Sequence, residues 1–174
     1  MNNLLRKISK KKWSDNRELT RNEYSADSIT GCIRTTRNTL SLWKSTTKDF
    51  SDVEVEKLVT ALATTTQKPD IIDVIWFDKS ELASLDLEVE DSPGTTPYSS
   101  INGLHCDIVN MNYQKLGELG EYMVKKISDD SNIKRFSKNK VIALVTDSVN
   151  RGDVDIRSLT DKWKAAVDPA NYSI

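Results

Sequence analysis

The segment Gly103–Asp107, with the sequence GLHCD, places the only histidine of the chain beside one of its two cysteines. Catalysis by a cysteine requires an imidazole within about 3 Å of the thiol, oriented in turn by a third polar group. Neighbouring residues point to opposite faces of a strand and diverge by about 100° on a helix, so His105 cannot readily activate Cys106. The apolar residues of this region have the pattern of core packing: Leu104, Cys106, Ile108 and Val109. We therefore predict that GLHCD is a structural segment.

Metal-dependent chemistry is the second option that the residue types allow. A zinc site takes about four ligands, whereas one histidine and two cysteines supply three, without a zinc-binding spacing. Carboxylates are more numerous, and Asp70, Asp73 and Asp78 bracket an apolar segment where a magnesium-dependent enzyme could hold its metal. Aspartates at this spacing also arise readily by chance in an acidic sequence. We keep a carboxylate-dependent metal enzyme as the third hypothesis, and predict no catalytic residue, no metal and no cofactor.

Length and composition indicate a globular chain. Its 174 residues, 37% of them hydrophobic and 29% charged, are enough to bury about two-thirds of the unfolded surface. No apolar segment approaches the roughly 20 residues that span a bilayer, and the basic start lacks the apolar core of a signal peptide. The two distant cysteines are then expected to be reduced thiols. We predict a cytoplasmic protein with no membrane partner.

The hydrophobic periodicity predicts an α+β or α/β fold with a small mixed sheet, four to five helices and a helical C-terminal half. The most apolar segment, Ile71–Phe77, is predicted to be a central buried strand. A second strand is predicted at Thr39–Ser45, and a helix capped by Ser51 or Asp52 lies between the two strands. This order permits either a parallel crossover or an antiparallel arrangement.

The remaining elements are expected to be mostly helical. A helical turn is predicted at residues 80–85, followed by a short edge strand at residues 87–90. Further helices are predicted at residues 25–31, 113–127, 137–149 and 158–168. Leu4, Leu5 and Ile8 share a helical face among lysines and arginines. We therefore expect residues 1–24 to form a basic arm or frayed helix, and residues 25–174 to form a single domain.

Charge is unevenly distributed along the chain. Residues 1–50 contain 11 Lys and Arg against 5 Asp and Glu, residues 51–100 contain 3 against 11, and residues 101–174 contain 11 against 10. Blocks of like charge of this kind often mark partner surfaces, although they also neutralise one another within a fold. The two charged blocks give two binding hypotheses.

The acidic block gives the leading hypothesis. Asp86, Glu88, Glu90 and Asp91 cluster before a Pro-Gly turn, with Tyr98 close by, and an extended chain puts Glu88 and Glu90 on one side. A negative patch with an aromatic margin can attract and hold a basic partner protein. Charges on an edge strand also serve simply to prevent aggregation. We predict a non-enzymatic protein-binding module of inhibitor or immunity type that masks a basic site on its partner, and leave its oligomeric state open.

The basic block gives the alternative hypothesis, a nucleic-acid-associated accessory protein. Lysines and arginines at the start of the chain have the charge that phosphate contacts require. The residues expected to bind nucleic acid in this case are Arg6, Lys7, Lys10, Lys11, Lys12, Arg34 and Arg37. An isoelectric point near 5.9 is not typical of a DNA-binding protein, so this hypothesis ranks second.

Overall fold

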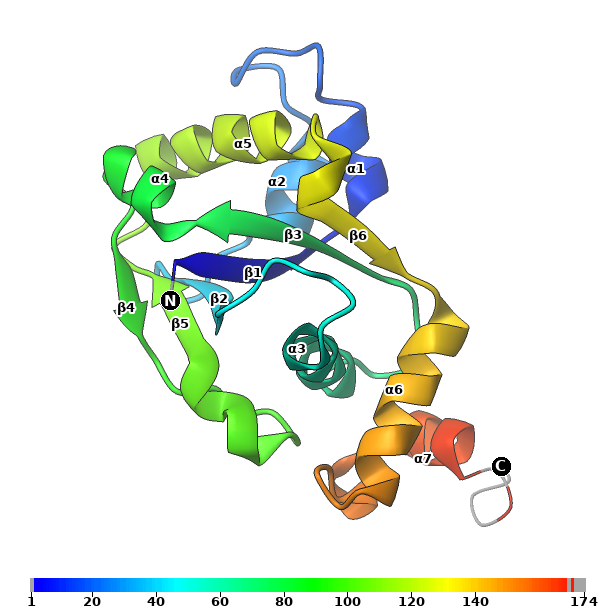
Figure 1. Ribbon diagram of the computed structural model, residues 1–174. Helices are drawn as coiled ribbons and strands as arrows, with labels where there is room; N and C mark the ends of the chain where they lie inside the picture. Colours follow the sequence, from blue (N-terminus) through cyan, green and yellow to red (C-terminus); the bar gives the residue numbers. More distant parts are fainter. Residues whose placement is uncertain (1, 169, 171–174) are drawn as a thin grey trace.

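Six strands form one curled sheet in the computed structural model, which describes residues 2–168 and 170 (Figure 1). The strands are β1 (Asn3–Ile8), β2 (Leu40–Ser45), β3 (Ile72–Asp78), β4 (Val89–Asp91), β5 (His105–Ile108) and β6 (Ile133–Phe136). Their order across the sheet is β4-β5-β2-β1-β3-β6, and every neighbouring pair is antiparallel. The α+β class is thus confirmed, whereas the sheet is antiparallel where a mixed sheet was predicted.

The beginning of the chain is a central strand. β1 lies between β2 and β3, with Leu4 and Ile8 buried on one face of the sheet and Leu5 buried on the other. The expected arm or frayed helix is therefore wrong for residues 3–8. Two consecutive leucines followed by an isoleucine fit a helical stripe, but they fit equally well a strand that is buried on both faces. The short helix α1 (Lys10–Ser14) then buries Trp13, so it too is part of the core.

The strands predicted at residues 39–45 and 71–77 and the helix between them are confirmed as β2, β3 and α3 (Val53–Thr64). The side chain of Asp52 caps α3 by accepting a hydrogen bond from the amide of Glu54 at 2.7 Å. β2 and β3 run in the same direction because both are antiparallel to β1, which lies between them. The connection through α3 therefore crosses over the intervening strand β1.

The other α-helices of the described residues are α2 (Ala26–Cys32), α4 (Lys79–Ser84), α5 (Tyr113–Ile127), α6 (Lys138–Asn150) and α7 (Asp161–Val167). Short 3-10 helices occupy Ser99–Leu104, Asp130–Asn132 and Ile156–Ser158. The second half of the chain is largely helical, but it also contains the strands β5 and β6. Four residues are too few to show the alternation by which a strand is predicted. Over the described residues, none of the helices has both the length and the apolar character needed to span a membrane.

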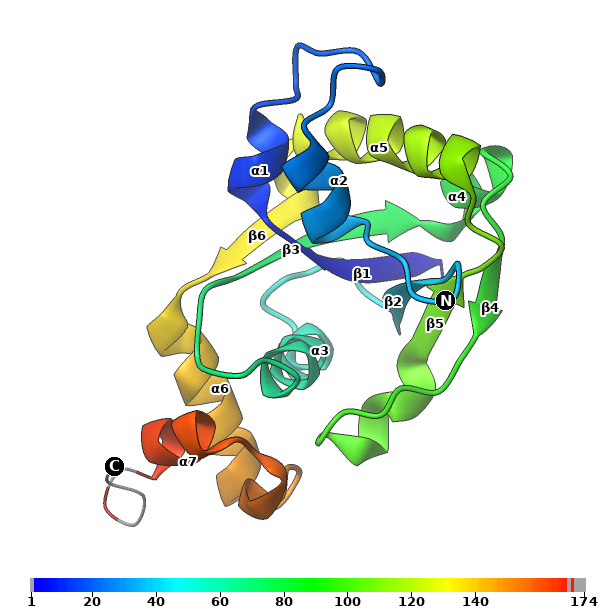
Figure 2. The ribbon, with the colours of Figure 1, turned by 180° about the vertical axis from the view of Figure 1, so that it is seen from behind.

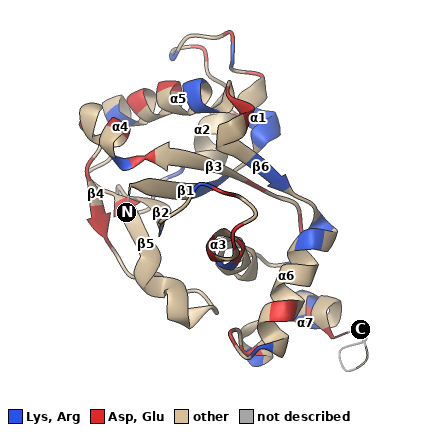
Figure 3. Cartoon of the chain, in the orientation of Figure 1, with Lys and Arg blue, Asp and Glu red and all other residues tan. Residues whose placement is uncertain are grey.

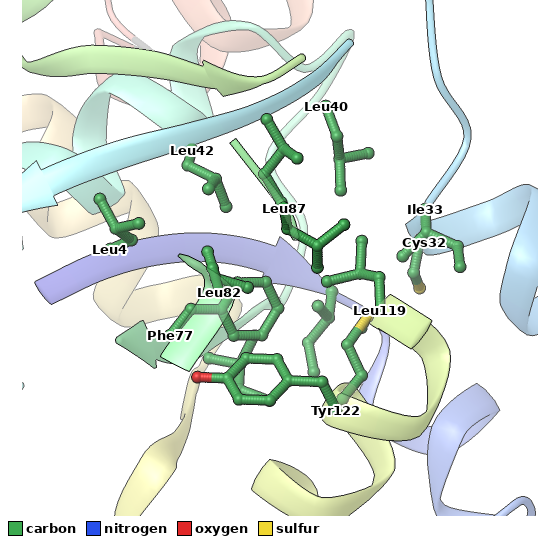
Figure 4. Close-up of a cluster of buried hydrophobic side chains, with 14 of the residues drawn as sticks. Leu4, Cys32, Ile33, Leu40, Leu42, Phe77, Leu82, Leu87, Leu119 and Tyr122 are labelled. Atoms are coloured by element: carbon green, nitrogen blue, oxygen red, sulfur yellow. The ribbon is translucent and has the colours of Figure 1, made fainter. Parts of the chain in front are cut away.

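The sheet carries a separate hydrophobic core on each face (Figures 1 and 2). On the face covered by α5, called here the α5 face, Leu4, Leu42 and Phe77 of the sheet pack with Leu119 and Tyr122 of the helix (Figure 4). On the opposite face, the α3 face, the core contains Leu5, Trp43, Trp76, Leu58 and Trp163. Each fully buried large side chain contributes about 1.5–3 kcal/mol. A sheet buried on both faces holds the strands firmly and leaves its two edges for contacts outside the molecule.

Candidate functional site

The GLHCD segment joins the end of a 3-10 helix to the strand β5. His105 and Cys106 begin β5, where Nδ1 of His105 donates to the carbonyl oxygen of Ser92 and the imidazole packs edge-on against Trp43, with 5.2 Å between ring centroids. Cys106 points to the α5 face, where burial raises the pKa of its thiol to about 11. The other cysteine, Cys32, also lies in the α5-face core, on the opposite side of the sheet from the imidazole. His105 therefore activates neither thiol.

Of the three aspartates considered for a metal site, Asp73 and Asp78 are bound to cations of the protein, and the exposed Asp70 accepts a hydrogen bond from the amide of Ile71 at 2.8 Å. Asp73 accepts hydrogen bonds from Nε of Arg135 at 2.7 Å and from the amide of Lys10 at 2.9 Å. Burial raises the pKa of this carboxyl group, but these hydrogen bonds outweigh burial and hold the pKa below its ordinary value. Asp78 is bound through one oxygen to Lys48 and through the other to Lys126. In the part of the chain that the structure describes, no three potential ligand side chains group around a metal position.

The seven basic residues of the alternative hypothesis do not share one surface. Arg6 and Lys7 are successive residues of β1 and so point to opposite faces of the sheet. The guanidinium of Arg6 donates to the carbonyl oxygens of Cys32 and Ser41, which ties it to the fold. Lys10, on α1, is paired with Asp130 at 2.9 Å. The remaining four are exposed, on α1 or after α2: Lys11, Lys12, Arg34 and Arg37.

The four acidic residues of the leading hypothesis are exposed together at one edge of the sheet, and they are called here the acidic edge: Asp86, Glu88, Glu90 and Asp91. β4 pairs with β5 on one side, and no strand of the described residues lies on the other (Figure 3). The predicted edge strand is thus confirmed. Asp91 binds Lys44 at 2.8 Å, whereas Glu88 and Glu90 have no ion pair within the described residues. Two carboxylates at this edge are therefore free to bind another molecule.

Tyr98 is not part of the acidic edge. Its side chain is 1% exposed and packs in the α3-face core, and its hydroxyl lies with Arg151 and Asp153. The loop that follows Pro93 and Gly94 directs this ring inward, so the predicted aromatic margin is corrected.

Two hollows lie beside α4, and only the first is lined by residues of the acidic edge. The first, of about 320 Å³, lies between α4 and β4 and is lined by Lys79, Ala83, Asp86, Leu87, Glu88 and Val89. Its apolar residues and the two carboxylates of Asp86 and Glu88 suit the aliphatic stem and cationic head of an arginine or lysine side chain, while Lys79 places one like charge at the same hollow. The second, of about 230 Å³, brings Glu118 and Glu121 of α5, both paired with Arg21, beside Glu81 of α4, which is paired with Lys126. Sequence reasoning missed these three glutamates, although the two on α5 are spaced as neighbours on one exposed helical face.

Neither a family model, nor a curated protein, nor a solved structure matches this chain.

Proposed function

We propose that the chain is a non-enzymatic protein-binding module whose acidic edge docks on a basic surface of a partner protein. The observation that carries this proposal is the exposure of Glu88, just before the outer strand β4, and of Glu90, within it, both without an ion pair in the described part of the chain and beside a hollow lined in part by Asp86 and Glu88. Opposite charge across an interface steers association and selects among partners. In its sharpest form the protein is an inhibitor of immunity type, which blocks a basic working site of its partner by covering it.

The proposed contact follows from strand geometry. Glu88 and Glu90 are two residues apart on an extended chain and so lie on one side, about 7 Å from each other. Two cations at a similar spacing on the partner can reach both carboxylates, while a third basic side chain enters the hollow between Asp86 and Glu88. The outer edge of β4 also offers backbone groups to which an extended partner segment can add as a strand. This arrangement attracts a basic protein at long range and fixes it at short range.

Affinity capture with the immobilised full chain tests the proposal. The bait variants are wild type, Glu88→Lys with Glu90→Lys, and a control, Glu18→Lys with Asp147→Lys, which makes the same change of net charge at two other exposed positions. Wild type and control are expected to retain the same basic partner, and the reversed edge is expected to bind it at least about tenfold more weakly. Equal retention by the reversed edge would remove the proposal. For the inhibitory form, the activity of the purified partner should fall in step with formation of a 1:1 complex.

A further inference from the structure

The edge of the sheet opposite to the acidic edge is basic. β6 is the outer strand there, and it leads directly into α6 (Figure 3). Its cations, called here the basic edge, are Lys134, Arg135, Lys138 and Lys140. Three of them line a groove of about 670 Å³ beside α3. Arg135 is bound to Asp73 and Lys140 to Glu56, whereas Lys134 and Lys138 have no ion pair within the described residues. Both edges therefore carry two free charges, of opposite sign.

One free charge of each edge lies on the same face of the sheet. Directly opposed residues of antiparallel strands point to one face, and so do residues two apart on a strand. Both kinds of step connect Glu90 to Lys134. The cross-strand pairs are Glu90 with Asp107, His105 with Trp43, Trp43 with Leu5, Leu5 with Trp76, and Val74 with Lys134, and the steps of two residues along a strand are Asp107 to His105 and Trp76 to Val74. Glu90 and Lys134 thus both lie on the α3 face. If the sheet of a second copy continued the sheet of the first, Glu90 of one copy and Lys134 of the other would lie on the same side of the joined sheet.

Strand direction favours the same arrangement. Five antiparallel pairings separate β4 from β6, so these two outer strands run in opposite directions. When a second copy stands beside the first in the same orientation, its β4 is antiparallel to β6 of the first. The antiparallel pattern of the sheet then continues unbroken from one copy to the next.

We propose that two copies of this chain associate in this way, with the acidic edge of one copy docked along the basic edge of the other. The inference rests on the proposed function, because it names a partner for the same acidic edge. Two acidic edges repel each other, and so do two basic edges, so only the head-to-tail contact is favourable. A head-to-tail contact leaves one free edge of each kind, so the assembly either grows as an open chain or closes into a ring.

The basic edge suits a polypeptide better than a nucleic acid. Single-stranded nucleic acid is bound by cations together with exposed aromatic rings on which bases stack. The aromatic residues of the groove are instead packed, since Phe136 is 4% exposed and Phe50 lies 5.6 Å from the ring of Trp76. An unpaired strand edge beside cations is complementary to an acidic strand, and this chain supplies one in β4.

Sedimentation of the full chain, combined with a charge exchange, tests this inference. Because β4 and β6 have three and four residues, the contact is small, and the protein is measured from about 10 µM to about 1 mM. Wild type should rise above the mass of one chain, 19.7 kDa, in about 20 mM NaCl, and return to it in about 500 mM NaCl. Glu88→Lys with Glu90→Lys, and Lys134→Glu with Lys138→Glu, should each weaken association at least about tenfold. An equimolar mixture of the two variants should associate again. The first variant then carries positive charge on both edges and the second carries negative charge on both, so each edge of one variant can pair with an edge of the other. A control, Lys162→Glu on α7, should behave as wild type.

Three results would overturn the inference: a wild-type protein that stays monomeric throughout, association that survives reversal of the basic edge, or a mixture that fails to associate. Reversal of the basic edge also separates this inference from the proposed function. It should weaken self-association and leave capture of a basic partner intact, whereas reversal of the acidic edge should weaken both.

Discussion

Nζ of Lys126 lies 2.7 Å from Oδ2 of Asp78, and the same nitrogen lies 2.6 Å from Oε2 of Glu81. The lysine, on α5, is 9% exposed, and it joins that helix to the end of β3 and to α4. Lys126→Met keeps the aliphatic stem but leaves two carboxylates without this partner. We expect a loss of about 2 kcal/mol in the free energy of unfolding, measured with urea. The neighbouring exposed Lys125→Met is the control, and an equal effect of both changes would contradict this role of Lys126.

The Asp78 carboxylate also predicts a dependence of stability on pH. Burial raises its pKa, but the hydrogen bonds from Lys126 and Lys48 outweigh burial and lower the pKa from 3.8 to about 2. Because the folded pKa lies below the unfolded one, the ion pair stabilises the fold above about pH 4 and ceases to do so as the pH falls toward about 2. The stability advantage of wild type over Asp78→Asn should therefore shrink by roughly 1 kcal/mol over this range. Urea unfolding at successive pH values measures the difference, and an advantage that stays constant would refute the assignment.

Trp13 and Trp163 give a matched pair for the energy of a buried hydrogen bond. Both rings are fully buried, but Nε1 of Trp163 donates to the carbonyl oxygen of Thr66 at 3.1 Å, whereas Nε1 of Trp13 has no acceptor in the described part of the chain. Replacement by phenylalanine removes a hydrogen-bond donor from a partly buried carbonyl group, that of Thr66, only at Trp163. Trp163→Phe should therefore destabilise the protein by about 1 kcal/mol more than Trp13→Phe does. Chemical unfolding of the two variants decides the matter, and a larger loss at Trp13 would contradict it.

The two glycines inside α5 predict unequal effects of alanine. A Cβ at Gly117 would lie 2.8 Å from Cδ of Arg21, a half-exposed side chain that can move aside. A Cβ at Gly120 would lie 3.3 Å from the ring of Tyr24, which packs edge-on against Trp13 and has less freedom. Since alanine is about 1 kcal/mol better than glycine in a helix, Gly117→Ala should stabilise the protein by about 0.5 kcal/mol. Gly120→Ala should be less stable than Gly117→Ala, and thermal unfolding that ranks the two in the reverse order would show that the close approach at Gly120 has no cost.

Local patterns predicted the elements that are long or clearly capped. The five apolar residues of the seven-residue β3 and the capped, periodic segment of α3 carry enough signal for these elements to be assigned by themselves. β1 was misassigned because Leu4 and Leu5 suit a helix face and a doubly buried strand alike. β5 and β6 are too short to show a period, and their pairing joins residues such as Leu42 with Cys106 that are far apart in the sequence. Such long-range pairing depends on the whole fold.

The candidate site was predictable in composition but not in its surroundings. Glu90 and Asp91 lie on an exposed outer strand, as the extended pattern indicates, while Asp86 and Glu88 precede that strand. The role of the four residues in binding stays a prediction. The burial of Tyr98 could not be read from the sequence, since its direction depends on the path of the loop over the α3 face. The opposition of an acidic and a basic edge likewise emerges only when the order of the strands is known.

Hydrogen exchange of the complex with the captured partner tests the central claim most directly. If the acidic edge is the docking surface, backbone amides of Val89–Asp91 should be protected when the partner is bound. Amides of Asp161–Val167, in α7 at the far end of the molecule, should exchange as in the free protein. Protection confined to other elements, with unchanged exchange at β4, would contradict the proposal that this chain binds its partner through its acidic edge.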